Sequence, residues 1–217
     1  MYDDVQFQKR SYITRNFLVD TRGHQLPICI PVAKAPNYSR IYEVGLSENW
    51  DAKYLSKKIK TIYARSPYFF DVYPFIDDIL HYNTCSLSAF NSFSIEQLCA
   101  LLSIPTELTT TDDIRKDVEL IEFELAQERP RQSLRCERVI RLCKLLGADT
   151  YINPEGGTHL YSKQYFKEYN IDLKFSYSAL NGHRDGHPQL KYASIIDVLM
   201  MNGVENTKRM LTQSLQK

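Results

Sequence analysis

Alternating apolar and polar positions near the amino terminus predict an antiparallel hairpin. Residues 12–19 (YITRNFLV) and 26–32 (LPICIPV) are rich in β-branched and aromatic side chains, and the six residues DTRGHQ connect them. Gly23 lies in this connection, where glycine takes the positive φ that tight turns need without steric cost. We expect a third extended segment at 39–46 (SRIYEVGL), after Pro36 and Asn37 interrupt the apolar pattern.

Apolar residues recurring every three to four positions predict helices through the middle of the chain. The first is expected at 50–65, with Ser47 or Asn49 as its cap. Its apolar stripe comprises Trp50, Tyr54, Leu55, Ile59, Ile62 and Tyr63. The stretch FFDVYPFIDDILHY predicts a second helix that breaks or begins at Pro74, and SLSAFNSFSIEQLCALLSI predicts a third that ends at Ile104.

From there the pattern alternates between strands and helices. The expected elements are a short strand at 106–111, a charged stretch at 112–132, a helix at 134–147 that ends at a glycine, a strand at 149–154, a helix at 163–170, a strand at 171–177 and a helix at 193–203 with a polar tail. Helices and strands that alternate through short links are typical of βαβ units and a parallel sheet.

The predicted fold class is therefore α/β, with a parallel sheet built from βαβ units, an antiparallel hairpin near the amino terminus and a helical middle section. We expect one domain over 1–217. Within it, 1–46 forms strands and the hairpin, 47–130 is mainly helical, and 131–217 holds the βαβ units and the last helices.

Charge and composition exclude several classes of function. The 27 basic and 26 acidic residues leave a net charge of +1, so no global field favours nucleic acid or a membrane surface. The sequence shows neither a signal peptide nor an apolar run long enough to span a bilayer, so we expect a cytoplasmic protein without membrane insertion. The 15 tyrosines and ten phenylalanines fit either a tyrosine-edged groove or plain packing, and packing is the commoner outcome.

The five cysteines are scattered and form no Cys-x-x-Cys pair, so neither a zinc site nor a disulfide framework is predicted. Cys136 and Cys143 lie seven positions apart on one predicted helix, which favours two thiols in a core. We expect no bound metal, and no cofactor can be assigned from the sequence.

The loop INPEGGTHLYS follows a predicted strand and precedes a helix, which is where ligands gather in α/β sheets. Gly156 and Gly157 let the backbone approach a ligand, and Ser162 is the expected helix cap. His159 and Tyr161 add a titratable ring and a hydroxyl. The alternative is a plain turn, since the loop lacks the glycine spacing of dinucleotide-binding and Walker motifs.

Two other polar groups have both a functional and a structural interpretation. The loop NGHRDGHPQ (181–189) carries two histidines and an aspartate, which suit a metal, although a solvated loop is the commoner outcome. Arg135, Arg138 and Arg141 recur every three residues on one predicted helix. They form either an anion-binding stripe or, as we favour, a solvated face paired with nearby carboxylates.

Four stretches of the chain resemble the WbqC-like protein family. They are DDVQFQKRSYITRN (3–16), LGADTYINPEGGTHLYSKQYFKEYNIDLKF (146–175), HPQ (187–189) and SIIDVLMMNG (194–203). Members of this family are found among genes for O-antigen and other surface polysaccharides. The resemblance implies transfer of a glycyl or other acyl-type group to an amino sugar. The alternatives are a non-catalytic protein that binds a sugar or nucleotide sugar in the same pathway and, with less support, a nucleotidyltransferase-like enzyme.

The resemblance also implies a site. The family's first polar cluster corresponds to Asp3, Asp4, Gln6, Lys9, Arg15 and Asn16, its glycine loop to Gly156 and Gly157, and its late loop to Pro188 and Gln189. The expected catalytic residues are Asp4 or His159 as the base and Lys9 as a donor to the oxyanion. The expected substrate-binding residues are Gln6, Arg15, Asn16, Asn153, Gly156, Gly157, His187 and Gln189. The structural alternative is that Lys9 and Arg15 only pair with the two aspartates at the surface.

Family members usually carry a segment with a His-Gln-Pro-x-Tyr-like run before the Asp-Asp pair. We therefore expect this chain to begin inside a strand, with Val5 and Phe7 buried on one face while Asp4 and Gln6 point the other way. An apolar edge left uncovered beside this strand predicts association with a second copy of the chain or with a partner.

Overall fold

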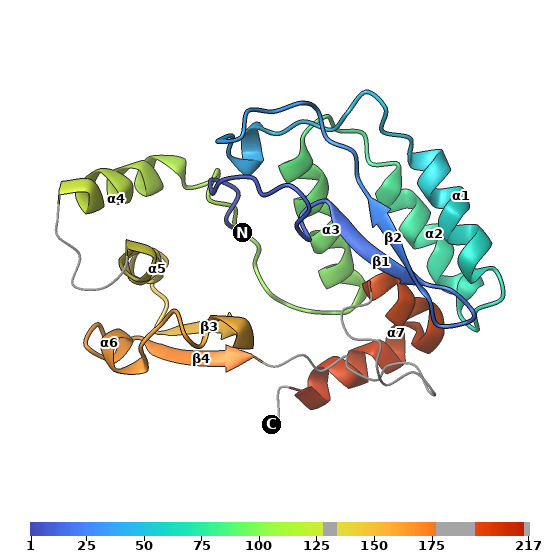
Figure 1. The fold of residues 1–217 in the computed structure, drawn as a ribbon. Helices are drawn as coiled ribbons and strands as arrows, with labels where there is room; N and C mark the ends of the chain where they lie inside the picture. The colour runs from blue at the N-terminus through green and yellow to red at the C-terminus, as the bar shows by residue number, and fades with distance from the viewer. Residues whose placement is uncertain (128–133, 177–193, 215–217) are drawn as a thin grey trace. The chain divides into compact units, whose positions relative to one another are not determined.

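The computed structural model describes residues 1–127, 134–176 and 194–214 (Figure 1). The chain divides into two compact units. The first comprises Met1–Asp112 and Ala179–Lys217, and the second comprises Asp113–Ser178. Each unit has a hydrophobic core of its own.

The first unit contains the predicted hairpin. Strands β1 (Arg15–Val19) and β2 (Gln25–Cys29) pair antiparallel, with Val19 opposite Gln25. The side chain of Asp20 accepts hydrogen bonds of 2.8 Å from two amides of the connecting loop, and Gly23 has a φ of 84°. The hairpin prediction is confirmed, together with the role of its glycine.

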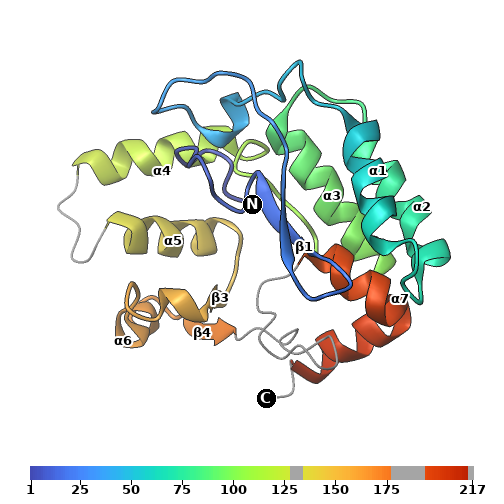
Figure 2. The same ribbon diagram turned by 45° about the vertical axis from the view of Figure 1, so that its right-hand side comes forward.

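Four helices pack beside this hairpin, as Figures 1 and 2 show. They are α1 (Ala52–Tyr63), α2 (Phe69–Leu80), α3 (Leu87–Leu101) and α7 (Ile195–Ser214). Their buried side chains form one cluster with Leu18 of β1, which is fully buried. Leu18 lies on the face of the hairpin that turns toward the helices, and its burial joins the small sheet to the helical layer.

Local details of these helices differ from the predictions. Asp51 caps α1 by accepting a hydrogen bond of 3.0 Å from the amide of Tyr54, so the proposed Ser47 and Asn49 caps are wrong. The side chain of Tyr54 is 68% exposed and does not belong to the apolar stripe. Pro74 lies inside α2 and neither breaks nor begins it.

Two predicted strands do not form. Residues 41–43 within the 39–46 segment make a 3₁₀ helix, η1 (Ile41–Glu43), and only single bridges flank it, among them Val32 with Leu46. The 106–111 segment has no strand, although the amide of Thr111 donates a hydrogen bond of 2.9 Å to the carbonyl of Met1. β-rich composition is a weak predictor where no neighbouring strand is available to complete a ladder.

The opening residues dock beside the segment that contains η1 rather than inside a sheet. The amide of Phe7 donates to Ser39 at 2.8 Å, and the amide of Ile41 donates to Val5 at 3.1 Å. The predicted burial of Phe7 is confirmed, and its neighbours in the cluster are Ile41 and Val44. Val5 is 40% exposed, so its predicted burial is wrong, because the segment is too irregular for strict alternation of faces.

The second unit contains a βαβ arrangement after two helices. Its elements are α4 (Arg115–Gln127), α5 (Leu134–Leu145), β3 (Thr150–Pro154), η2 (Glu155–Gly157), α6 (Lys163–Lys167) and β4 (Asp172–Ser176). Strands β3 and β4 are parallel, and α6 connects them. Gly147 follows α5 with a φ of 64°, which confirms the predicted helix end.

The fold is therefore mixed α/β, as predicted, but the sheets are small. In the described ranges β1 pairs only with β2 and β3 only with β4, so the larger parallel sheet is not shown. Alternation of helices and strands predicted the βαβ unit, whereas the number of strands that join a sheet depends on pairing between distant segments.

The core of the second unit contains the two cysteines predicted to lie there. Cys136 and Cys143 on α5 are buried. Burial, with a smaller effect from the neighbouring Glu137, raises the pKa of Cys136 to about 11. Burial and the hydrogen bond that its hydroxyl donates to Glu137 raise the pKa of Tyr165 in the same core.

We expect the free energy of unfolding to fall as the pH rises above 9. The thiol of Cys136 ionises near its ordinary pKa of 9.0 in the unfolded chain but only near 11 in the folded one. Its contribution is thus fully present below pH 9 and is lost as the pH rises to about 11. Urea unfolding at several pH values, followed by circular dichroism, measures this slope.

The matched variants are Cys136→Ala, which removes the buried thiol, and Cys85→Ala, which removes an exposed one. The alkaline slope should become shallower in Cys136→Ala and stay unchanged in Cys85→Ala. Equal slopes in all three proteins would contradict the prediction.

Candidate functional site

The two aspartates of the opening segment belong to a structural network. The carboxylate of Asp3 is 5% exposed and accepts hydrogen bonds from the hydroxyl of Ser88 at 2.7 Å and from the amide of Asp112 at 3.1 Å. The hydroxyl of Thr111 lies 2.7 Å from both Asp3 and Asp4. This network anchors the start of the chain to α3 and to residues 111–112, and the catalytic role of Asp4 stays a prediction.

Gln6 and Lys9 both contact Asn37. The side-chain amide of Gln6 donates a hydrogen bond of 2.7 Å to the carbonyl of Asn37, and the ammonium of Lys9 lies 3.4 Å from the side-chain oxygen of the same residue. The structural alternative, in which Lys9 and Arg15 only pair with the two aspartates, stays a prediction.

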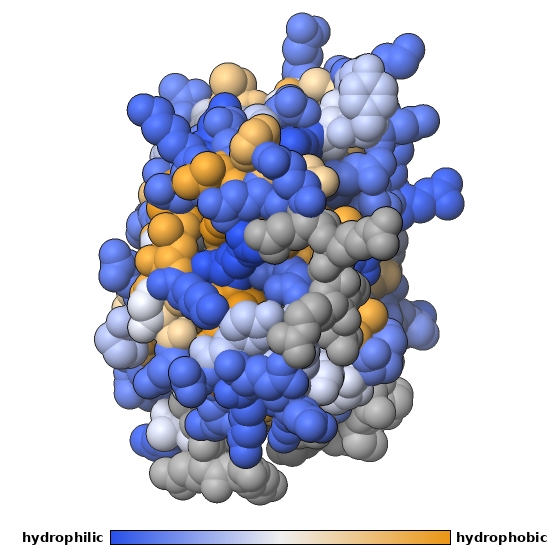
Figure 3. Space-filling model, turned by 90° about the vertical axis from the view of Figure 1, so that its left-hand side faces the viewer, coloured by the Kyte–Doolittle hydropathy of each residue, from blue (hydrophilic) through white to orange (hydrophobic). Residues whose placement is uncertain are grey.

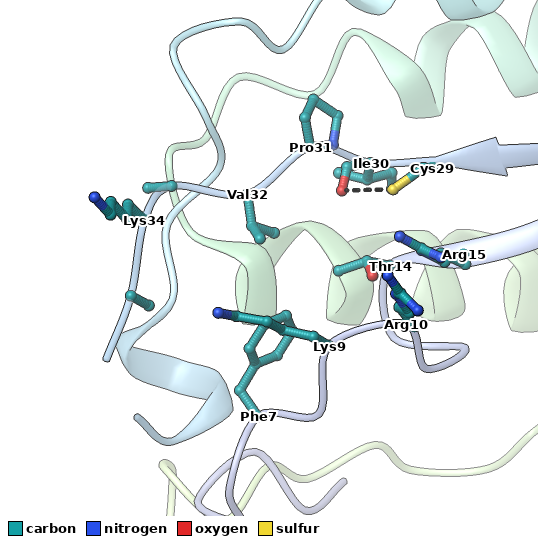
Figure 4. A pocket seen from close by; sticks show the side chains of 12 residues that line it. Phe7, Lys9, Arg10, Thr14, Arg15, Cys29, Ile30, Pro31, Val32 and Lys34 are labelled. Atoms are coloured by element: carbon teal, nitrogen blue, oxygen red, sulfur yellow. Dashed lines mark hydrogen bonds between the residues drawn. The ribbon is translucent and has the colours of Figure 1, made fainter. Parts of the chain in front are cut away.

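Lys9 and Arg15 line a hollow of about 430 Å³ at the open end of the hairpin, which we call the cationic pocket (Figure 4). Its charged lining residues are Lys9, Arg10, Arg15 and Lys34, and its apolar surface includes Phe7, Ile30 and Val32. In Figure 4 the side chain of Lys34 points away from the other three cations. The described lining contains no carboxylate, so the pocket has a local excess of positive charge.

Local backbone geometry places these cations. Arg15 and Cys29 are opposite each other in the hairpin, so their side chains lie on the same face. Arg10 has a φ of 69°, which costs a residue other than glycine about 1–2 kcal/mol. Strained residues of this kind cluster at binding sites, where the surrounding structure maintains them.

A second hollow, of about 200 Å³, adjoins the cationic pocket, and we call it the apolar pocket. The two hollows share Thr14, Arg15, Cys29 and Ile30 as lining residues. The rest of the lining comes from residues 12–13, from Asn16 and Ile28 of the hairpin, and from side chains of α1, α2, α3 and α7, with Asn91 and Ser94 among the polar ones. Asn16, a predicted substrate-binding residue, thus lies at the apolar pocket and not among the cations.

The glycine loop lies in the second unit and has a packing explanation. A β-carbon at Gly157 would lie 2.7 Å from the side-chain nitrogen of Asn153, so the missing side chain makes room for that residue. A β-carbon at Gly156 would meet no atom within 4 Å, and neither glycine has a positive φ. Ser162 caps α6 as predicted, accepting from the amide of Tyr165 at 3.3 Å.

His159 lines a different hollow in the second unit, beside Arg135, Leu134 and Leu160. The face in Figure 3 shows apolar residues in patches among polar ones. Among the described residues of the second unit, the exposed large apolar ones are Leu120, Phe123, Leu134, Leu145, Leu146, Ile152 and Leu160. His159 is therefore exposed beside an apolar surface of its own unit.

Two of the three arginines on α5 pair with carboxylates of α4. Arg138 lies 2.6 Å from Glu122, and Arg141 pairs with Glu124. The predicted pairing with carboxylates is confirmed for both residues, but their side chains are only 16% and 23% exposed, so the face is not the solvated one that was predicted. The 181–189 loop, for which a metal site was weighed against a solvated loop and which carries His187 and Gln189, lies outside the described residues.

The matches to known proteins cover nearly the whole length of the chain. A model of the WbqC-like protein family matches residues 1–209. The chain belongs to the WbqC-like protein family. It is also similar to the uncharacterized protein Rv1507c of Mycobacterium tuberculosis (strain ATCC 25618 / H37Rv), with 26% identity over 212 residues that cover 94% of this chain and 84% of that protein. No solved structure matches the chain significantly.

The match to the WbqC-like family includes every residue that lines the cationic and apolar pockets. Sequence reasoning found Lys9, Arg15 and Asn16 but missed Arg10, Lys34 and Asn91. Arg10 follows Lys9 directly, and such a basic pair beside a predicted strand was an available signal. Asn91 offered none, because it lies in a helix whose pattern indicates only packing.

Other features of this WbqC-like chain are reported for the described ranges alone. There, no three His, Cys, Asp or Glu side chains gather closely enough to hold a metal ion. Nor does any helix combine the length and apolar character that crossing a bilayer requires.

Proposed function

We propose that this protein binds a phosphorylated or nucleotide-linked amino sugar in the cationic pocket and transfers a glycyl or other acyl-type group to it during surface-polysaccharide synthesis. The observation that supports this proposal is the group of basic side chains around one hollow without a lining carboxylate. Phosphate groups pair strongly with arginine and lysine, and arginine adds bidentate geometry. Family membership supplies the setting in polysaccharide synthesis.

The transfer makes two chemical demands. The amine nitrogen of the sugar attacks the carbonyl carbon of the acyl donor, a C–N bond forms, and the bond from that carbon to the leaving group breaks. A base must take the amine proton, and hydrogen-bond donors must stabilise the oxyanion that develops on the carbonyl oxygen. Lys9 and Arg15 are the proposed donors, and Asp4, which belongs to the same unit, is the proposed base.

A second candidate function has its own support. The described lining of the cationic pocket includes neither a carboxylate nor an imidazole, so it provides no general base beside the cations. A protein that binds the nucleotide sugar and presents it to another enzyme needs only the binding half of the site. Both candidates predict the same ligand and differ in whether that ligand is consumed.

Binding is tested by charge reversal. We expect Arg15→Glu to weaken binding of a nucleotide sugar by about 10- to 100-fold, since one hydrogen-bonded charge contributes about 1.5–3 kcal/mol. Isothermal titration calorimetry measures the dissociation constant. Arg22→Glu is the matched control, because Arg22 is an exposed arginine of the same hairpin outside the pocket. Equal affinity of wild type and Arg15→Glu would refute the assigned site.

Catalysis is tested by mass spectrometry of an amino-sugar nucleotide incubated with candidate acyl donors and the protein. A product heavier by the acyl group, absent without protein, supports the transferase. A nucleotide sugar that raises the melting temperature but is never consumed supports the presenting protein instead.

A further inference from the structure

We infer that the apolar pocket is the nucleobase subsite of the same ligand, so that the ligand is a nucleoside diphosphate sugar rather than a sugar phosphate or a lipid-linked sugar. This inference rests on the proposed function, because it requires the phosphates to occupy the cationic pocket. It adds the class of ligand and the position of its base.

The first argument is the adjacency of two hollows with opposite character. The pleat of the hairpin directs Arg15 and Cys29 to one face and Asn16 and Ile28 to the other. The cationic pocket is completed by Lys9, Arg10 and Lys34, and the apolar pocket by Asn16, Ile28 and side chains of the helices. The two hollows meet at their four shared residues, Thr14, Arg15, Cys29 and Ile30. A nucleoside diphosphate has the same division, with a charged pyrophosphate joined through ribose to an uncharged ring.

The second argument is the hydrogen-bonding capacity of two amides in the apolar pocket. The side-chain oxygen of Asn16 accepts from the amide of Phe17 at 2.8 Å, which orients its NH₂ group as a donor. The NH₂ group of Asn91 donates to the carbonyl of Ile13 at 3.1 Å, which leaves the side-chain oxygen of Asn91 as an acceptor. One donor and one acceptor complement the edge of a nucleobase, which presents both kinds of group side by side.

The same amides argue against a lipid tail. Phe90, Ile76 and Leu98 provide apolar walls that suit the faces of a planar ring. A polyprenyl chain would cover the amides of Asn16 and Asn91 without offering them a partner, and burying an amide in that way is costly. The volume of the hollow, about 200 Å³, is also small for such a chain.

The test compares four probes by calorimetry on the full chain: uridine diphosphate, adenosine diphosphate, inorganic pyrophosphate and farnesyl diphosphate. We expect at least one nucleoside diphosphate to bind about tenfold or more tightly than pyrophosphate, since each well-placed base contact contributes about 1–3 kcal/mol. Farnesyl diphosphate should bind no more tightly than pyrophosphate.

Two variants locate the effect. Asn91→Leu removes the acceptor, and Leu98→Phe fills the pocket while both amides remain. Each should weaken nucleoside diphosphate binding about tenfold and leave pyrophosphate binding unchanged, by the same estimate for a base contact. Having two variants protects the test, because Asn91→Leu also removes the hydrogen bond to Ile13.

Chemical labelling gives an independent readout on the unmodified chain. Cys29 is exposed and lines both hollows, whereas Cys85 is exposed and lines neither. At ten times its dissociation constant, a nucleoside diphosphate should slow alkylation of Cys29 about tenfold by mass action and leave Cys85 unchanged. Peptide mass spectrometry measures both rates.

The outcomes separate this inference from the proposed function. Equal binding of pyrophosphate and both nucleotides, unchanged in the two variants, overturns the base subsite and leaves the anion site standing. Tighter binding of farnesyl diphosphate than of either nucleotide overturns it in favour of a lipid-linked ligand. Failure of all four probes to bind refutes the proposed function and the subsite with it.

Discussion

Replacing Tyr63 by phenylalanine is expected to lower the free energy of unfolding of the first unit by about 3 kcal/mol, the sum of a hydrogen bond to a charged group and one to a buried amide. The hydroxyl of Tyr63 donates to the carboxylate of Asp197 at 2.8 Å and accepts from the amide of Val19 at 3.0 Å. Tyr63 and Asp197 are fully buried. One oxygen atom thus joins α1, α7 and β1.

Urea unfolding followed by the fluorescence of Trp50, the single tryptophan, measures this change. The control is Tyr54→Phe, which removes a hydroxyl from the same helix at a side chain that is 68% exposed. It should change stability by less than about 0.5 kcal/mol, as surface substitutions usually do. Equal midpoints for the two variants would show that the buried network does not stabilise the unit.

Gly203→Ala is expected to destabilise the first unit by about 3 kcal/mol, since a strained backbone costs about 1–3 kcal/mol and overpacking costs a similar amount. Gly203 has φ 72° and ψ 173° inside α7, a conformation that is essentially restricted to glycine. A β-carbon there would lie 2.7 Å from two ring atoms of Tyr68.

Thermal unfolding of three variants separates the two causes. Gly156→Ala, where a β-carbon meets no atom within 4 Å, should leave the melting temperature nearly unchanged. Gly203→Ala combined with Tyr68→Leu should recover the part of the loss that comes from the clash but not the part that comes from the backbone. If Gly203→Ala were as stable as wild type, α7 would not require the kink at this position.

The accuracy of the sequence-based predictions depended on the range of the interactions involved. The hairpin, the βαβ unit and the end of α5 just before Gly147 follow from periodicity and turn residues within a few positions. The strands expected at 39–46 and 106–111 fail because a strand also needs a partner, and no neighbouring pattern reports one. The burial of Val5 fails for a related reason, since only Phe7 of that segment faces the cluster with Ile41.

The candidate site shows the same division. Lys9 and Arg15 were predicted as ligand donors from the opening segment, and they line the cationic pocket with Arg10. The predicted roles of Asp4 and His159 stay predictions, as does their convergence with the 181–189 loop. The sequence had no means to show that Asp3 is engaged by Ser88, which lies 85 positions away.

What the sequence by itself determined is the set of local elements, the near balance of charge and membership of the WbqC-like family, which the family match confirms. These properties depend on residue types and their spacing, both of which are visible along the chain. Only the tertiary structure decided that the aspartate pair anchors the first residues while the neighbouring cations surround a hollow. The physical reason is that pairing, burial and pocket formation depend on groups that folding brings together from distant positions, and local spacing contains no record of those partners.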